Sequence, residues 1–160
     1  IGRRVWGASP PAAPPPEVFA TRRRMGNVAT VIFHNPDCGT SRNVLAAIRA
    51  TGTEPVVVEY LATGWTRTQL QALFAAADLT PRAALRVSGT PAAALGLTAD
   101  DVSDDALLDA MVAQPILVNR PIVCTPRGVA LCRPSEAVLP LLERQPTGPL
   151  LKEDGTPLFG

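Results

Sequence analysis

Apolar residues along this chain occur either in short continuous runs or at helical spacing. The runs over residues 29–34 and 54–60 are rich in β-branched residues, which predicts a buried strand followed by a second strand. Between them, residues 41–52 carry apolar side chains three and four positions apart and end at a glycine, which predicts a helix. The three segments together have the size of a strand, helix, strand crossover unit.

The middle of the chain is expected to be a helical insertion. A helix capped by Thr66 comes first, and residues 82–114 then continue in shorter helical pieces. The last of these pieces has Ser103 at its N-cap position and acidic residues in its first turn, where they favour a helix N-terminus.

Three short β-like runs follow, over residues 115–119, 121–125 and 128–132, and the last two are expected to form a hairpin. Residues 133–143 then predict a closing helix, with Pro134 in its first turn. The order β-α-β, helical insertion, β-β-α is that of a thioredoxin-like α/β fold with a mixed sheet.

Composition favours one domain and a leader. The 160 residues, 46% of them hydrophobic, suffice for a single core. Residues 1–27 are mostly proline, alanine and arginine, so they are expected to be a disordered or non-native leader before a domain over 28–160. Met25 is a candidate for the natural start, which leaves the status of residues 1–24 open.

Charge and cysteine content exclude several classes of function. The net charge is +1, and the basic excess lies in the first 29 residues, which hold five arginines against one glutamate. The body therefore has no basic surface of the kind that nucleic-acid binding requires, and no run of about 18 apolar residues predicts a membrane span. Three cysteines without paired spacing indicate a reducing, cytoplasmic setting rather than a disulfide framework.

Cys38 is the candidate reactive residue. It falls between a predicted strand ending at His34 and a predicted helix beginning near Ser41, so its sulfur is expected at a helix N-terminus, where the free N–H groups stabilise a thiolate. His34 is expected to add positive charge or a hydrogen bond if its ring faces the loop. The alternatives are a small buried cysteine without reactivity and a structural histidine.

The spacing from Cys38 to Ser41 is C-x-x-S, with serine where a dithiol oxidoreductase has its second cysteine. Cys38 would therefore need a thiol from elsewhere. Cys124 and Cys132 are interpreted as buried strand residues, and a resolving role for Cys132 would require it to lie beside Cys38.

The segments "HNPDCGTSRN", "ALR", "ILVNRPIV" and "LCRPSE", in this order and spacing, resemble the arsenate reductases of the glutaredoxin- and glutathione-coupled class. The resemblance runs from about Val28 to Asp154 and implies a thioredoxin-like fold with a helical insertion. It also implies a cis bond between Arg120 and Pro121.

The resemblance implies roles for six residues. Cys38 matches the nucleophile, His34 a residue that lowers the pKa of that cysteine, and Ser41 one that hydrogen-bonds the thiolate. The oxyanion is held in that family by three arginines, which match Arg86, Arg120 and Arg133. Guanidinium groups suit this task because they supply charge and paired donors to a tetrahedral anion.

The implied reaction is reduction of arsenate to arsenite in arsenic detoxification. Cys38 attacks arsenate to form a covalent thiol-arsenate adduct, glutathione attacks the adduct as co-substrate, and glutaredoxin reduces the mixed disulfide. No bound cofactor and no metal are implied. Cys124 departs from the family, which more commonly has an aliphatic residue there, and leaves a second redox thiol open.

Two other interpretations remain at this point. A redox-sensing regulator of the same fold usually keeps a C-x-x-C pair and does not need three arginines, whereas Ser41 breaks such a pair here. A monothiol oxidoreductase acting on glutathionylated proteins also has no need for the arginines.

Overall fold

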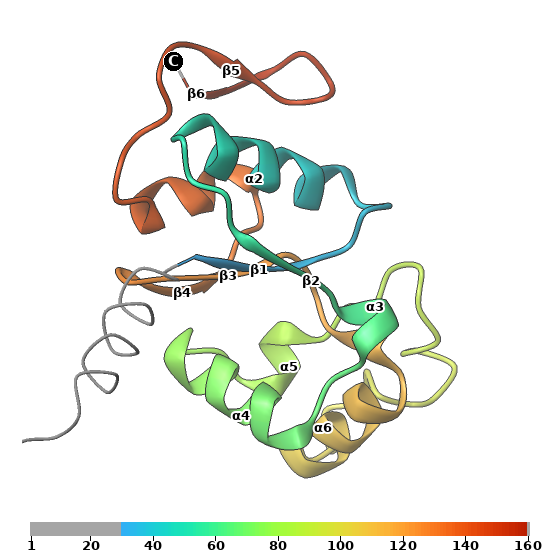
Figure 1. The fold of residues 1–160 in the computed structure, drawn as a ribbon. Helices are drawn as coiled ribbons and strands as arrows, with labels where there is room; N and C mark the ends of the chain where they lie inside the picture. The colour runs from blue at the N-terminus through green and yellow to red at the C-terminus, as the bar shows by residue number, and fades with distance from the viewer. Residues whose placement is uncertain (1–29, 160) are drawn as a thin grey trace, which may run out of the picture.

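A four-stranded mixed sheet forms the centre of the protein in a computed structural model that describes residues 30–159 (Figure 1). The strands lie in the order β2-β1-β3-β4, and β1 runs parallel to β2 and antiparallel to β3. Their bounds are β1 Val31–His34, β2 Val56–Glu59, β3 Ile122–Thr125 and β4 Gly128–Leu131. The expectations for residues 1–27 and for a start at Met25 lie outside the described residues.

Two helices cover one face of the sheet (Figure 1). They are the α-helix α2 (Gly39–Ala50) and the 3-10 helix η2 (Ser135–Leu141). Ile32 of β1 and Val123 of β3 are fully buried against them, together with Val44. α2 ends as predicted, because Gly52 adopts a φ of +85° that favours glycine.

The helical insertion covers the opposite face (Figure 1). Phe33, the neighbour of Ile32 in β1, points into this larger core and packs against Trp65 with ring centroids 5.1 Å apart. Thr66 forms a complete capping box with Gln69, as its position predicted. The insertion comprises α3 (Tyr60–Thr63), α4 (Arg67–Ala76), α5 (Pro81–Ala84) and α6 (Asp104–Ala113).

Two predictions about secondary structure were wrong. Residues 115–119 are not a strand: Pro115–Leu117 form the 3-10 helix η1, because the proline lacks the N–H that a strand ladder needs, and only Val118 forms a bridge, to Leu85. The middle helical piece of the insertion is also absent, since residues 86–103 form turns rather than a helix.

The chain ends in a small second sheet that the apolar pattern did not predict. β5 (Leu150–Leu151) and β6 (Pro157–Phe159) are too short to show a period of their own. Leu158 packs in the same core as α2, and Glu153 in the turn of this hairpin forms an ion pair with Arg42, with 2.5 Å between Nε and Oε1. Among residues 30–159 no helix is long and apolar enough to cross a membrane.

Candidate active site

Cys38 is the N-cap residue of α2, so it stands at a helix N-terminus as predicted, although the helix begins at Gly39 rather than near Ser41. β1 ends at His34, and a tight turn follows, in which the Cys38 N–H donates to the Asn35 carbonyl at 3.1 Å. The Asn35 side chain holds the same turn by accepting from the Asp37 N–H at 2.9 Å. Cys38 then has an extended backbone, and the helix begins at Gly39, so the sulfur lies at the positive end of α2.

The surroundings of Cys38 favour its thiolate. Burial disfavours the charged form, since the residue is only 6% exposed. The backbone N–H of Ser41 and the guanidinium groups of Arg120 and Arg133 outweigh burial, so the pKa of Cys38 lies below its ordinary value. These surroundings are typical of reactive cysteines rather than of inert buried thiols.

Arg120 precedes β3 and Arg133 follows β4, so both arginines lie near the sulfur at the open end of the β3–β4 hairpin. The Cys132 N–H donates to the Pro121 carbonyl at 2.9 Å, which holds the two arginine-bearing segments side by side. Arg133 Nη1 lies 3.7 Å from Cys38 Sγ and donates to the Arg120 carbonyl at 3.2 Å. The Arg120–Pro121 bond is cis, as the resemblance implied.

Arg86 comes to the same place from the helical insertion. The residue before it, Leu85, bridges to Val118, and the Asn119 N–H donates to the Ala84 carbonyl at 2.8 Å, so the end of α5 is tied to the segment that leads into Arg120. Burial lowers the pKa of Arg86, and the positive charge of Arg120 lowers it further. Cations that repel one another here would be stabilised by a shared anion.

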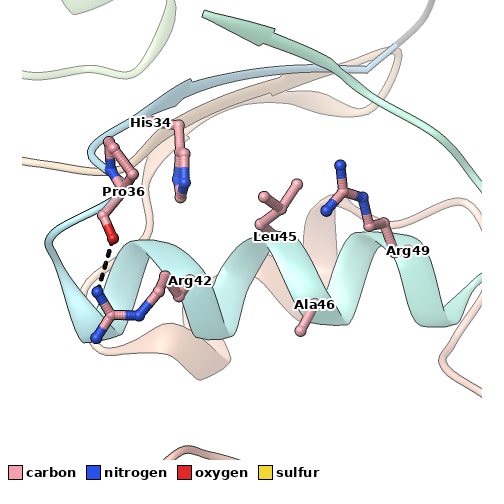
Figure 2. A pocket seen from close by; sticks show the side chains of 6 residues that line it. All are labelled: His34, Pro36, Arg42, Leu45, Ala46 and Arg49. Atoms are coloured by element: carbon pink, nitrogen blue, oxygen red, sulfur yellow. Dashed lines mark hydrogen bonds between the residues drawn. The ribbon is translucent and has the colours of Figure 1, made fainter. Parts of the chain in front are cut away.

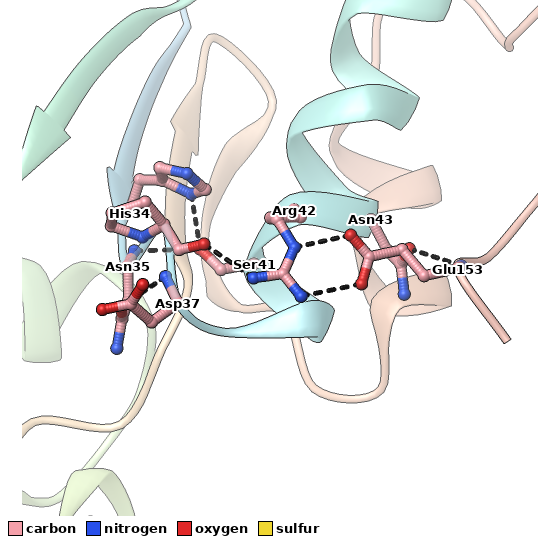
Figure 3. Close-up of polar contacts among 8 residues, drawn as sticks. His34, Asn35, Asp37, Ser41, Arg42, Asn43 and Glu153 are labelled. Carbon is pink, nitrogen blue, oxygen red and sulfur yellow. Dashed lines mark hydrogen bonds and ion pairs between the residues drawn. The ribbon is translucent and has the colours of Figure 1, made fainter.

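His34 and Ser41 form a buried pair close to the loop that carries Cys38, and Figure 3 shows the contact between them. His34 Nδ1 lies 2.6 Å from Ser41 Oγ, and the same hydroxyl accepts from the Asn35 N–H at 3.1 Å. Burial lowers the pKa of His34, which favours its neutral form. The structure therefore places the ring against Ser41 rather than in a hydrogen bond with the sulfur, and Ser41 acts on the sulfur through its backbone.

The ion pair between Arg42 and Glu153 links the start of α2 to the C-terminal hairpin (Figure 3). Arg42 also donates from Nη1 to the Pro36 carbonyl at 2.7 Å, in the turn that leads to Cys38. A surface pocket beside His34 (Figure 2) is bounded by two arginines of α2, Arg42 and Arg49, and by none of the three arginines that surround Cys38.

The other two cysteines do not lie in such surroundings. All three are free, and Cys132 is fully buried in the core under α2, where its thiol donates to the Ala130 carbonyl. Burial raises the pKa of Cys132 to about 12 and also raises the pKa of Cys124. Both are far from ionised near neutral pH, in keeping with their interpretation as strand cysteines.

One further side chain, which no sequence motif singles out, belongs to this cluster. Tyr60 follows β2 directly and is 1% exposed, and its hydroxyl oxygen has no hydrogen-bond partner among residues 30–159. Its position directly after a parallel strand could have indicated that it lies near Cys38, because neighbouring parallel strands end at the same edge of the sheet. Within the same residues, no group of three metal-ligating side chains exists.

Comparison with known families decides the relationship. The model of the ArsC family matches residues 33–141, which hold every residue of the cluster around Cys38. The chain belongs to the ArsC family.

Named relatives agree with this assignment. The chain is 66% identical over 125 residues to arsenate reductase ArsI2 of Synechocystis, with 78% of this chain and 89% of the relative covered. It is 50% identical over 131 residues to an arsenate reductase of Escherichia coli K12, with 82% and 92% covered. The solved structure of an arsenate reductase from Vibrio cholerae aligns with a TM-score of 0.67 at 38% identity, over 71% of this chain and 97% of that one.

These comparisons confirm two predictions from the sequence. The order of strands and helices along this ArsC-family chain, and its mixed sheet, are those of the thioredoxin-like fold. The resemblance to arsenate reductases, drawn from four short motifs, holds over most of the chain.

Proposed function

We propose that this ArsC-family protein is an arsenate reductase that converts arsenate to arsenite in arsenic detoxification. The observation that carries the proposal is the contact between Cys38 and Arg133, 3.7 Å from Sγ to Nη1, inside a cluster that also includes Arg86 and Arg120. A thiolate beside several guanidinium groups is suited to attack on a tetrahedral oxyanion, because the cations hold the anion next to a nucleophile that would otherwise repel it.

In the first step, the Cys38 thiolate attacks arsenate. A bond forms between sulfur and arsenic, and one arsenate hydroxyl leaves as water after taking up a proton. Arg120 and Arg133 stabilise the charge on the remaining oxygens, and Arg86 holds the adduct from the side of the insertion. His34 and Ser41 keep the loop in place, because the Ser41 hydroxyl joins His34 Nδ1 to the Asn35 N–H.

In the second step, a glutathione thiolate attacks the Cys38 sulfur of the adduct. A disulfide bond forms between the two sulfurs, the bond from sulfur to arsenic breaks, and its electron pair reduces arsenic from the +5 to the +3 state. Arsenite leaves. A glutaredoxin thiol then takes the glutathione moiety and restores the Cys38 thiol, so the electrons come from thiols and the chain needs no resident cofactor.

An external thiol is supported by the state of the other cysteines. Cys132 is fully buried with a pKa of about 12, and burial also raises the pKa of Cys124, so neither provides a thiolate to resolve the adduct. Glutathione and glutaredoxin as electron donors suit a protein of the reducing cytoplasm.

The test is an assay of NADPH oxidation coupled through glutathione reductase, glutaredoxin and glutathione to arsenate. The wild-type protein is expected to give turnover that depends on arsenate, and Cys38→Ser is expected to abolish it. Cys124→Ala is the matched control, since it removes a partly buried thiol outside the cluster and should keep the rate.

Three outcomes would count against the proposal. A wild-type protein that processes glutathionylated substrates but not arsenate would be a monothiol oxidoreductase. Full activity in Cys38→Ser would exclude Cys38 as the nucleophile, and loss of activity in Cys124→Ala would reveal an internal resolving thiol.

A further inference from the structure

Tyr60 lies at the edge of the sheet where the Cys38 loop and the arginines meet. β1 and β2 are parallel with His34 opposite Glu59, so the residues that follow them, Asn35 and Tyr60, leave the sheet at the same edge. β3 is antiparallel to β1, with Phe33 opposite Ile122, which brings Arg120, two residues before Ile122, to that edge as well. Three segments distant in sequence thus converge on one place.

The Tyr60 ring is buried, and its hydroxyl lies near the Asn35 side chain without a hydrogen bond of normal geometry to it. The ring stacks on Trp65, with centroids 5.1 Å apart and 24° between the planes, and only 1% of the residue is exposed. The hydroxyl oxygen is buried without a hydrogen-bond partner among residues 30–159. Buried polar groups are nearly always paired, so an unpaired one at a functional site calls for an explanation.

A second unpaired donor lies in the same cluster. Arg120 Nε is also buried and has no partner within the described part of the chain, although Nη1 of the same guanidinium donates to Asn119 Oδ1 at 3.3 Å. Both unpaired groups are hydrogen-bond donors, and both lie near the thiolate. A single ligand with several acceptor oxygens can therefore accept a hydrogen bond from each of them. A tetrahedral oxyanion is such a ligand.

The charges around the phenol decide its role as a donor. Burial raises the pKa of Tyr60, and the nearby guanidinium groups of Arg120 and Arg86, together with the Asn35 side chain, only partly oppose that effect. The hydroxyl therefore keeps its proton at neutral pH. A neutral donor adds a hydrogen bond to the anion without adding another cation to a cluster whose arginines already repel one another.

We propose that the Tyr60 hydroxyl donates a hydrogen bond to an oxygen of the bound oxyanion, which makes Tyr60 a fourth substrate-binding residue beside the three arginines. For arsenate this inference rests on the proposed function. It differs from the role of the arginines in one measurable way: because the phenol is uncharged, it binds the anion and leaves the ionisation of Cys38 unchanged.

The direct test is Tyr60→Phe, which removes one oxygen and keeps the ring on Trp65. We expect the KM for arsenate to rise about ten-fold or more, as for loss of a hydrogen bond to a charged group, with kcat changed by less than about three-fold. The pH midpoint of Cys38 alkylation should stay at its wild-type value. Thr63→Ala, which removes an exposed hydroxyl from the same short helix α3, is the control and should leave KM unchanged.

A second measurement does not depend on turnover or on a variant. Tyr60 is the only tyrosine in the chain, so protein labelled with 3-fluorotyrosine gives a single fluorine resonance from this site. Titration with sulfate, an oxyanion that is not reduced, is expected to shift that resonance and to slow alkylation of Cys38. The chemical shift and the alkylation should give the same dissociation constant.

The outcomes separate the two proposals. If the wild-type protein reduces arsenate but Tyr60→Phe has the wild-type KM, or is only less stable, Tyr60 has a structural role and this inference fails while the proposed function stands. If arsenate is not reduced at all, the proposed function fails, and the sulfate titration still decides whether Tyr60 contacts an anion. A fluorine resonance that does not move while sulfate protects Cys38 would overturn the inference.

Discussion

Replacement of Arg133 by alanine tests the electrostatic basis of the site. The Arg133 guanidinium lies 3.7 Å from the Cys38 sulfur, at which distance two unit charges interact by about 1 kcal/mol in a fully aqueous dielectric. Arg133 is exposed whereas Cys38 is buried, so the effective interaction lies somewhat above that limit, at about 1–2 kcal/mol. Since about 1.4 kcal/mol corresponds to one pKa unit, Arg133→Ala is expected to raise the pKa of Cys38 by about one unit.

The assay is the rate of alkylation of Cys38 by iodoacetamide between pH 5 and pH 10, followed by mass spectrometry of the modified peptide. Below both pKa values the rate should fall about ten-fold in Arg133→Ala, because the thiolate fraction falls by that factor. Cys132 is buried and Cys124 is partly buried, and both, with raised pKa values, should react far more slowly. At 1 M salt the difference between the two proteins should shrink, since the charge is exposed.

The matched control is Arg127→Ala. Arg127 lies in the turn of the same β3–β4 hairpin, at the opposite end from Arg120, and donates to the Leu142 carbonyl at 3.3 Å. Its removal lowers the net charge by the same amount and should leave the alkylation midpoint of Cys38 in place. An Arg133→Ala protein that titrates at the wild-type midpoint, or an equal shift in Arg127→Ala, would refute a local charge effect.

Two further predictions concern stability. Thr66→Ala removes the side chain that accepts from the Gln69 N–H, and it should lower the free energy of unfolding by about 1 kcal/mol in urea titrations. The control is Thr68→Ala, on the exposed surface of the same helix, which should lower the free energy of unfolding little or not at all. Burial lowers the pKa of His34, so the stabilisation linked to its neutral form is present above the unfolded pKa of about 6.5 and is lost as the pH falls through the folded value. His34→Gln should therefore show a shallower loss of stability between pH 7 and pH 5, and equal slopes in the two proteins would contradict this.

Local sequence patterns were enough to predict the helices and strands whose formation depends on residues close together in the chain. The strand at 31–34, the helix after Cys38, and the caps at Thr66 and Ser103 follow from β-branched runs, helical spacing and capping side chains, all of which act within a few residues. The strand expected at 115–119 failed because a single proline at its start outweighed a favourable apolar run. The final hairpin was not predicted because β5 and β6 are too short to show an alternation of apolar and polar residues.

The sequence by itself determined that Cys38 begins a helix, that its C-x-x-S spacing lacks a second thiol, and, through motif resemblance, that three distant arginines belong with it. Only the tertiary structure decided how they meet. The register of β1 with β2 and β3 brings Tyr60 and Arg120 to one edge, and a bridge at Leu85 carries Arg86 to the same place. Strand register and the packing of the insertion are properties of contacts between segments far apart in the chain, so no local pattern records them.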